Sequence, residues 1–177
     1  MGAPVLLDVS PLLHRAWFLE ESQAQQDGRV PIPGARLVAM LDGLIRRFDL
    51  RPGAPAAAVF DVWPTWRHDE YPLYKAKRAP KSEGLRDFLR AARQVLAIHG
   101  FPAVQVAGFE ADDVICSLAH RTDGAVVVSG DKDFFQFLGV RGCRMWDPLL
   151  DDAAGGRGDW VTALGVWKKF GIDLRTG

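Results

Sequence analysis

The sequence predicts a doubly wound α/β domain with a mostly parallel central sheet flanked by helices. Three observations lead to this class: short apolar runs alternate with longer amphipathic segments, the runs are rich in β-branched residues or alanine, and most run out into an acidic residue. Uninterrupted apolar runs are typical of parallel strands covered on both faces, and their alternation with helices is the pattern of βαβ units. A chain of 177 residues fits a single domain, residues 1–177.

Each element is predicted from its own local pattern. Four runs are expected to be buried strands: PVLLD (4–8), AAAVFD (56–61), AVQV (103–106) and AVVVSGD (125–131). Apolar residues recur at helical spacing in residues 37–48, 85–96 and 114–119. Towards the end of the chain we expect an edge strand at RMW (144–146), a glycine-rich loop at 151–159, and a last helix over residues 160–170 capped by Asp159.

The composition excludes several classes of protein. The chain is 48% hydrophobic and 25% charged, which is typical of a globular domain and not of a disordered one. Its apolar runs are too short for a membrane span or a signal peptide, so we expect a cytoplasmic protein with no membrane segment. Cys116 and Cys143 have no CxxC partner and are expected to be buried free thiols. The four histidines lack zinc-site spacing, and no GxxxxGK[ST] phosphate loop is present.

One basic segment stands out in a chain whose formal net charge is zero. From Trp66 to Arg93 there are eight basic and four acidic residues, so the segment carries +4 and the rest of the chain −4. It lies in an unusually long, proline-containing connection after the second predicted strand, and long connections in compact domains are usually functional. The segment is either a phosphate-binding face for nucleic acid or a solvated helix face.

Acidic residues gather where the predicted strands end. Seven of them follow strands or open the next helix: Asp8, Asp61, Glu110, Asp112, Asp113, Asp131 and Asp133. Ligands of an open parallel sheet bind outside the carboxyl ends of its strands, so all seven are expected at one edge. A single aspartate there is an ordinary helix cap. Seven carboxylates in one crevice would raise one another's pKa unless cations lie among them.

Mg²⁺ or Mn²⁺ is the cation that this arrangement predicts. Hard divalent ions take oxygen ligands, and two of them ~4 Å apart activate water and stabilise a leaving oxygen in phosphodiester cleavage. Lys75 and Arg78, three residues apart, are expected on one side of a helix, where they would bind a phosphate and stabilise the charge of an in-line attack. Arg67 and Lys81 are expected to contact phosphates without base preference.

Aromatic residues are interleaved with these cations. Tyr74, Trp63 and Trp66 lie among Arg67 and Lys75, an arrangement that would stack on unpaired bases. For Trp63 and Trp66, however, we expect packing in the core, with stacking on bases as the alternative.

Five motifs occur in the order and spacing of a known family: LLDVSPLLHRAW, AAVFD, WRHDEYPLYKAKRAP, GFEADDVICSLA and VVVSGDKDFFQFL. From about Val5 to about Gly171 the chain resembles the bacterial 5′ nuclease family, which comprises the 5′–3′ exonuclease domain of DNA polymerase I and the related flap endonucleases. The resemblance implies a PIN-like, resolvase-like core with a basic helical arch at about residues 62–84. It also implies metal-dependent hydrolysis of DNA at 5′ flaps, 5′ ends or single strands.

The resemblance assigns roles to individual residues. Asp8, Asp61, Glu110, Asp112 and Asp113 match the family's first-metal cluster, with Asp131 and Asp133 reaching the second site. Lys75 and Arg78 match the cations that approach the scissile phosphate from the arch. Tyr74 matches the aromatic residue that stacks on a nucleobase.

The chain departs from the family after the helix that matches WVTALGVWKKFG. Family members continue into a further acidic segment for the second metal and a helix–turn–helix-like module that binds duplex DNA; the 177 residues contain neither. The second metal site is therefore expected to be short of ligands, and the chain is either a fragment or a short protein completed by another protein.

Three hypotheses compete on this sequence. The first is a metal-dependent 5′ nuclease, and the second is a non-catalytic nucleic-acid-binding or accessory module of the same ancestry. The third is a phospho-acceptor receiver domain, which also clusters aspartates and a lysine near one Mg²⁺. A receiver needs neither seven acids nor a basic arch.

Overall fold

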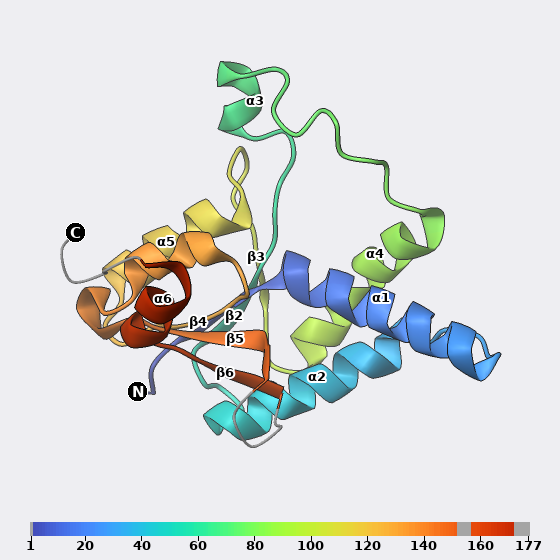
Figure 1. Ribbon diagram of the computed structural model, residues 1–177, viewed down its shortest axis with the longest axis horizontal. Helices are drawn as coiled ribbons and strands as arrows, with labels where there is room; N and C mark the ends of the chain where they lie inside the picture. The colour runs from blue at the N-terminus through green and yellow to red at the C-terminus, as the bar shows by residue number, and fades with distance from the viewer. Residues whose placement is uncertain (1, 152–156, 172–177) are drawn as a thin grey trace.

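The structure is a computed structural model that describes residues 2–151 and 157–171. A six-stranded sheet in the order β3-β2-β1-β4-β5-β6 forms its centre (Figure 1). The strands are β1 (Val5–Asp8), β2 (Ala56–Val59), β3 (Ala103–Val104), β4 (Val126–Val128), β5 (Arg144–Asp151) and β6 (Arg157–Val161). All neighbouring pairs are parallel except β5 and β6. The predicted doubly wound, mostly parallel α/β class is confirmed.

Helices cover both faces of this sheet (Figure 1). One face carries α1 (Val9–Asp27), α2 (Pro33–Phe48) and α4 (Glu83–Ile98), and the other carries α5 (Ala111–Arg121) and the 3₁₀ helix η1 (Lys132–Phe137). The remaining helices are α3 (Trp66–Glu70), the 3₁₀ helix η2 (Val140–Gly142) and α6 (Ala163–Phe170). No helix in the described part of the chain is both long and apolar enough to cross a membrane.

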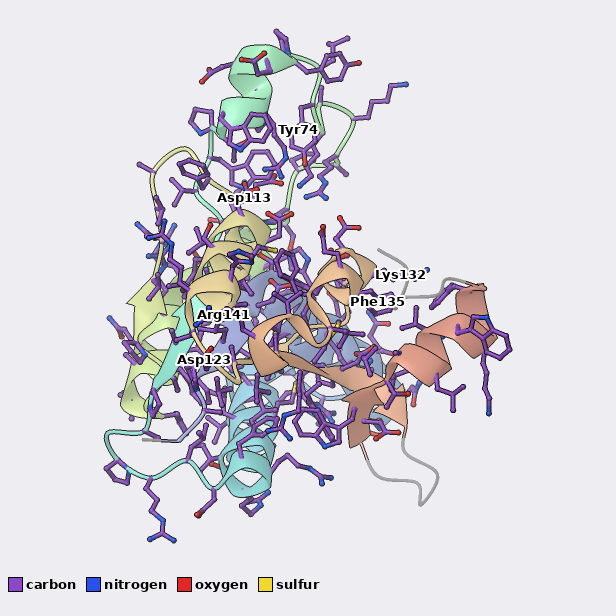
Figure 2. All side chains as sticks on the ribbon, turned by 90° about the vertical axis from the view of Figure 1, so that its left-hand side faces the viewer. Tyr74, Asp113, Asp123, Lys132, Phe135 and Arg141 are labelled. Atoms are coloured by element: carbon purple, nitrogen blue, oxygen red, sulfur yellow. The ribbon has the colours of Figure 1, made fainter. Side chains whose placement is uncertain are left out.

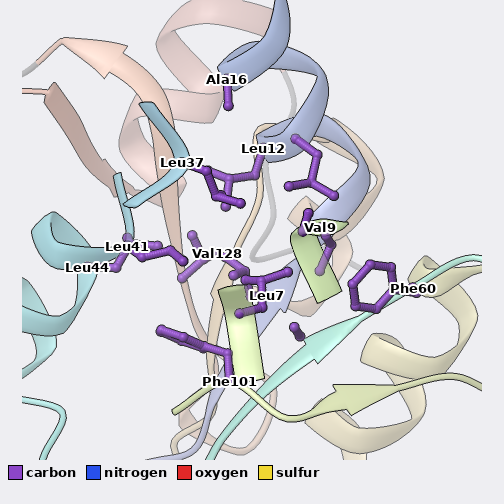
Figure 3. Close-up of a cluster of buried hydrophobic side chains, with 14 of the residues drawn as sticks. Leu7, Val9, Leu12, Ala16, Leu37, Leu41, Leu44, Phe60, Phe101 and Val128 are labelled. Carbon is purple, nitrogen blue, oxygen red and sulfur yellow. The ribbon is translucent and has the colours of Figure 1, made fainter. Parts of the chain in front are cut away.

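The two-residue period of the strands creates two hydrophobic cores. Leu7 and Val128 point towards α1, α2 and α4, where they pack with Leu12, Leu37 and Leu41 (Figure 3). Their neighbours in the strands, such as Leu6 and Val127, point to the opposite face and pack beneath α5. Each fully buried side chain of this size contributes about 1.5–3 kcal/mol. These cores hold the carboxyl ends of β1, β2 and β4 at one edge.

Helix α1 is the element that the sequence pattern does not predict. Its buried stripe contains small alanines and the acidic Glu20, which weaken the apolar pattern. Glu20 is only 5% exposed, yet it accepts hydrogen bonds from Arg29 (2.5 Å), Arg36 (3.3 Å) and the Ile32 backbone N–H (3.0 Å). A charge can occupy a core position of α1 because α2 and the loop before it supply these donors.

Three local predictions near the end of the chain are corrected. RMW belongs to a longer strand, β5, which is paired on both sides, so that β6 is the edge strand. The last helix begins later than predicted, and its N-cap is Thr162, whose side chain accepts a hydrogen bond from the Gly165 N–H at 3.0 Å. Asp159 lies in β6 and bonds the Trp160 N–H instead. Residues 152–156 of the predicted glycine-rich loop lie outside the described residues.

The long connection from β2 to α4 rises away from the body as an arch (Figure 1). We define the arch as residues 62–82. It contains the short helix α3, followed by successive turns and an extended return to α4. The expectation that Lys75 and Arg78 share one side of a helix is wrong, because Lys75 has a positive φ of 54° and lies in these turns. A turn bond from the Arg78 N–H to the Lys75 carbonyl (3.0 Å) links the two residues instead.

The two cysteines are free, as predicted. Cys143 is buried and Cys116 is half-buried in the core beneath α5.

Candidate active site

The strand order places a crevice at the carboxyl ends of β1 and β4. The chain leaves β1 for β2 and β3 on one side and later returns to β4 and β5 on the other, so β1 and β4 flank the switch point at which open α/β sheets bind ligands. A cavity of about 530 Å³ opens there beneath the arch. Five of the seven predicted acids line it: Asp8, Asp61, Glu110, Asp112 and Asp131. Three predicted cations line it as well: Lys75, Arg78 and Lys81.

Two serines orient the carboxylates at the floor of this cavity. Ser129 follows β4 and donates to Asp8 at 2.7 Å, and Ser10 in the first turn of α1 donates to Asp61 at 2.7 Å. Asp61 also accepts the Ala111 N–H at the start of α5, at 2.8 Å. Neither serine was predicted from the sequence, although each lies two residues from a strand-end aspartate in DVS or SGD. His14 was not predicted either; it lines the cavity with a buried Nε2 that has no hydrogen-bond partner among the described residues.

Four of the five carboxylates in the cavity, Asp8, Asp61, Asp112 and Asp131, have no ion-pair partner among the described residues. Burial raises the pKa of Asp8 to about 7, and the negative charges of Asp61, Asp131 and Asp112 add to that rise. Burial likewise raises the pKa of Asp112. The cavity therefore has an unsatisfied demand for positive charge.

The arch supplies two hydrogen bonds to the remaining acid of the cavity, and Arg67 Nη1 lies 3.5 Å from the same carboxylate. Glu110 is only 3% exposed, and its two oxygens accept hydrogen bonds from Lys75 Nζ (2.7 Å) and Tyr74 Oη (2.9 Å). The Lys75 ammonium also lies over the rings of Tyr74 (4.8 Å) and Trp63 (5.3 Å). Trp63 is 44% exposed and Trp66 is 45% exposed, so the expectation that these tryptophans pack in the core is wrong.

The last two predicted acids line a neighbouring cavity. Asp113 and Asp133 lie there with Arg67 and Trp66, and Asp112 lines both cavities. Arg67 forms two hydrogen bonds with Asp113, from Nη1 at 2.5 Å and from Nη2 at 2.9 Å. Burial raises the pKa of Asp113, but the hydrogen bonds from Arg67, the Glu110 N–H and Trp66, together with the charge of Arg67, outweigh burial and lower that pKa. The arginine predicted to contact phosphate thus neutralises a predicted metal ligand.

The oxygen donors in the main cavity suit a hard divalent cation. The buried Asp8, the half-buried Asp61 and Asp112, and the exposed Asp131 repel one another and form the donor set that such an ion requires. Across residues 2–151 and 157–171, however, no three His, Cys, Asp or Glu side chains are already grouped as a metal site. The carboxylates would therefore have to close around an ion.

An acidic crevice at the switch point of a parallel sheet, beneath a basic arch, defines a class of resolvase-like α/β domains. Residues 3–171 match the family described as "5′-3′ exonuclease, N-terminal resolvase-like domain", and the chain belongs to this family. The resemblance inferred from the five motifs is thereby confirmed.

Several relatives share most of this chain. A 5′-3′ exonuclease of Streptomyces coelicolor is 34% identical over 185 residues, which cover 96% of this chain and 60% of that protein. DNA polymerase I of Pseudomonas aeruginosa is 31% identical over 173 residues, 95% of this chain and 18% of the polymerase. A thermostable DNA polymerase I of Thermus thermophilus is 26% identical over 176 residues, which cover 97% of this chain and 20% of the polymerase. The chain thus spans three fifths of the exonuclease and about a fifth of the polymerases.

Proposed function

We propose that this chain is the catalytic core of a divalent-metal-dependent 5′ nuclease that hydrolyses phosphodiesters in DNA at 5′ flaps, 5′ ends or single strands. One observation carries the proposal: uncompensated aspartates and the arch cations Lys75 and Arg78 line the same cavity at the switch point. Membership of the 5′-3′ exonuclease family and the names of the relatives support it. A receiver domain does not account for the arch or for the family match.

The residues of the cavity divide into two functional sets. Asp8, Asp61, Asp112 and Asp131 would hold Mg²⁺ or Mn²⁺, and Asp133 would extend this set towards a second ion from the neighbouring cavity. The metal supplies Lewis acidity and a more acidic bound water when it is present. Ser10 and Ser129 keep the carboxylates of Asp61 and Asp8 turned into the cavity.

The second set faces the nucleic acid. Arg78 and Lys81 line the cavity and would bind the oxygens of the scissile phosphate and its neighbour. Lys75, preorganised over two aromatic rings, would stabilise the negative charge that develops during attack. Tyr74 and the exposed Trp63 provide ring surfaces at the same place for unpaired bases.

The test uses a labelled 5′-flap DNA with Mg²⁺, with Mn²⁺ and with chelator. We expect metal-dependent cleavage by the wild type and none by Asp112→Asn, which removes a cavity carboxylate. Asp123→Asn, which changes an acid that is 81% exposed and paired with Arg141, is the matched control and should cleave normally. Cleavage that persists in chelator, or in Asp112→Asn, would contradict the proposal.

A non-catalytic nucleic-acid-binding module is the second candidate, and one observation favours it. Lys75 and Tyr74 already engage Glu110, a predicted metal ligand. If that candidate holds, the wild type will bind flap DNA in a salt-dependent way yet leave it intact with either metal.

The substrates and partners of the whole protein are part of the proposal, since the chain covers 60% of the Streptomyces exonuclease and less of the polymerases. We infer that duplex binding depends on contacts beyond the arch, supplied by further sequence or by another protein. A DNA substrate also places the activity in the cytoplasm. Adding the C-terminal part of a family member to the cleavage assay should raise both the rate and the preference for flaps.

A further inference from the structure

Helix α3 of the arch is joined to the start of α5 by an ion pair that the proposed mechanism leaves unused. Arg67 in α3 and Asp113 in α5 are 46 residues apart, and each side chain is 23% exposed. Their two parallel hydrogen bonds form the bidentate geometry in which arginine binds carboxylates most specifically. Figure 2 shows Asp113 at the end of α5 nearest the arch, below Tyr74.

The carboxylate of Asp113 has little capacity left for a metal ion. Besides the two bonds from Arg67, it accepts hydrogen bonds from Trp66 Nε1 (3.4 Å) and from the Glu110 N–H (3.3 Å). Three of these four N–H groups point at Oδ2 and one at Oδ1, so Oδ2 is saturated and Oδ1 keeps a single lone pair. By contrast, the Asp112 carboxylate accepts one backbone N–H, from Asp113 at 2.8 Å.

Backbone contacts beside this ion pair also hold the start of α3 against the loop before α5. Thr65 and Gly108 form an isolated parallel bridge, and the Trp66 N–H donates to the Gly108 carbonyl at 2.8 Å. The Arg67 guanidinium also stacks on the Trp66 ring at 4.7 Å. Beyond α3, the side-chain hydrogen bonds from the arch to the body run to Glu110, from Tyr74 and Lys75. The Arg67–Asp113 pair therefore anchors α3 to the body, and Arg67 Nη1 also lies 3.5 Å from Glu110 Oε2.

We propose that Arg67 is a positioning residue and Asp113 its partner, and that together they anchor the arch so that Lys75 and Arg78 stay over the acidic cavity. In this assignment Asp113 serves the arch and not a metal ion, and Arg67 does not contact phosphate. The assignment rests on the proposed nuclease function only for the roles of Lys75 and Arg78. The anchor itself is testable in the metal-free, DNA-free protein.

The first experiment measures amide hydrogen exchange in residues 62–82 of the full chain without metal or DNA. Arg67→Ala and Asp113→Ala should each speed exchange of the arch at least tenfold, and the double variant should show no further increase. Arg67→Lys should give an exchange rate between those of wild type and Arg67→Ala, because lysine keeps the charge but cannot form two parallel hydrogen bonds with a carboxylate. Arg141→Ala, which removes the more exposed pair with Asp123 (Figure 2), is the matched control and should leave the arch unchanged.

Amides of β1 and β4 report whether a variant is still folded. If a single alanine variant also loses protection in β1 and β4, the test uses the charge-swapped double variant Arg67→Asp, Asp113→Arg instead. Recovery of arch protection in that double variant supports the anchor. Unchanged arch exchange in both alanine variants, or no recovery in the charge-swapped double variant, overturns it.

The second experiment follows Mn²⁺ binding by the paramagnetic resonance of the free ion. The Arg67→Ala, Asp113→Ala double variant removes one charge of each sign and should bind Mn²⁺ within about threefold of wild type. Asp112→Ala should bind it at least tenfold more weakly. If the double variant lost as much Mn²⁺ affinity as Asp112→Ala, Asp113 would be a metal ligand and the assignment would be overturned.

The third experiment separates positioning from phosphate contact. Arg67→Ala should lower the turnover of flap cleavage on the order of 10²-fold, as misplaced catalytic groups do, without changing the salt dependence of DNA binding. A salt slope smaller by about one would mean that Arg67 contacts a phosphate, against the proposal. If the wild type does not cleave DNA, the proposed function fails. Amide exchange and Mn²⁺ binding still test whether Arg67 and Asp113 anchor the arch.

Discussion

Asp8 is a buried acid whose protonation is coupled to folding. Its pKa is raised to about 7, so the folded protein holds this proton more tightly than the unfolded chain does. The protonated form stabilises the fold, and this stabilisation is complete below about pH 4 and is lost as the pH rises through about 7. A shift of this size corresponds to about 4 kcal/mol in the metal-free protein.

Replacing Asp8 by asparagine should therefore remove most of this pH dependence. We expect the free energy of unfolding of metal-free wild type to fall between pH 4 and pH 8 relative to that of Asp8→Asn. The measurement is urea unfolding in chelator over this pH range. Asp123→Asn, at a site 81% exposed, should follow the wild type. Parallel curves for wild type and Asp8→Asn would show that burial does not perturb this carboxyl.

Lys75 and Arg78 should affect catalysis without affecting metal binding. Both line the acidic cavity, and neither is a metal ligand. Lys75→Ala or Arg78→Ala should lower the turnover of flap cleavage on the order of 10²-fold, as the loss of one preorganised charge-stabilising donor does. The rise in melting temperature with Mg²⁺ or Mn²⁺ should remain, because ligand binding to the folded state stabilises it.

Lys75→Ala also frees the Oε1 oxygen of Glu110, so Mn²⁺ should bind this variant at least as tightly as wild type. Arg51→Ala, which changes an exposed arginine paired with Asp49, serves as the control for both activity and melting. If neither Lys75→Ala nor Arg78→Ala showed a rise in melting temperature with metal, the roles assigned to Lys75 and Arg78 would be wrong.

At the scale of elements, the β5–β6 hairpin depends on a glycine pressed against a tryptophan. Gly158 has φ 87°, and a Cβ added there would lie 2.6 Å from the Trp146 indole nitrogen. Gly53 has a similar φ of 84° but no heavy atom within 4 Å of such a Cβ. Alanine at Gly53 should cost about 1–2 kcal/mol for the left-handed backbone. At Gly158, overpacking should add about 1–3 kcal/mol.

Thermal or urea unfolding of the two alanine variants measures this difference directly, because the backbone cost is common to both. Equal destabilisation would mean that Trp146 moves aside freely. The same comparison tests whether β6, part of which was predicted to be a loop, is an integral strand of the sheet.

At the scale of the whole molecule, DNA affinity should depend only weakly on salt. Of the eight cations between Trp66 and Arg93, two bind acids of the body, one pairs with Asp87, and Arg93 stacks on Phe60. The other four make no ion pair among the described residues: Lys77, Arg78, Lys81 and Arg86. Roughly four phosphate contacts to a single strand give a slope of log K against log salt of about −3.

Fluorescence anisotropy of labelled single-stranded and flap DNA between about 50 and 200 mM salt measures this slope. We expect residues 1–177 to bind both substrates with similar, weak affinity. A slope steeper than about −6, or strong preference for the flap, would reveal a phosphate-binding surface outside the arch.

The local patterns of the sequence determined the architecture and the chemistry of the site. Buried parallel strands are apolar on both faces, so β1, β2 and β4 are visible as short continuous runs. Acids at strand ends necessarily meet at one edge of a parallel sheet, which is why the order of residues along the chain suffices to group Asp8, Asp61 and Asp131. Both inferences depend only on neighbours along the chain and on the rule for parallel sheets.

Only the tertiary structure decided which charges pair. Glu20 interrupts the apolar pattern of α1, so the sequence does not predict this helix. The arginines that neutralise Glu20 come from the next loop and from α2. Arg67 could have faced a phosphate, but Asp113 lies within reach only after α5 packs beside the base of the arch. Lys75 and Arg78 share a cavity through a turn and not through a helix. Pairing energies fall steeply with distance and with exposure to water, and neither quantity is set by spacing along the chain.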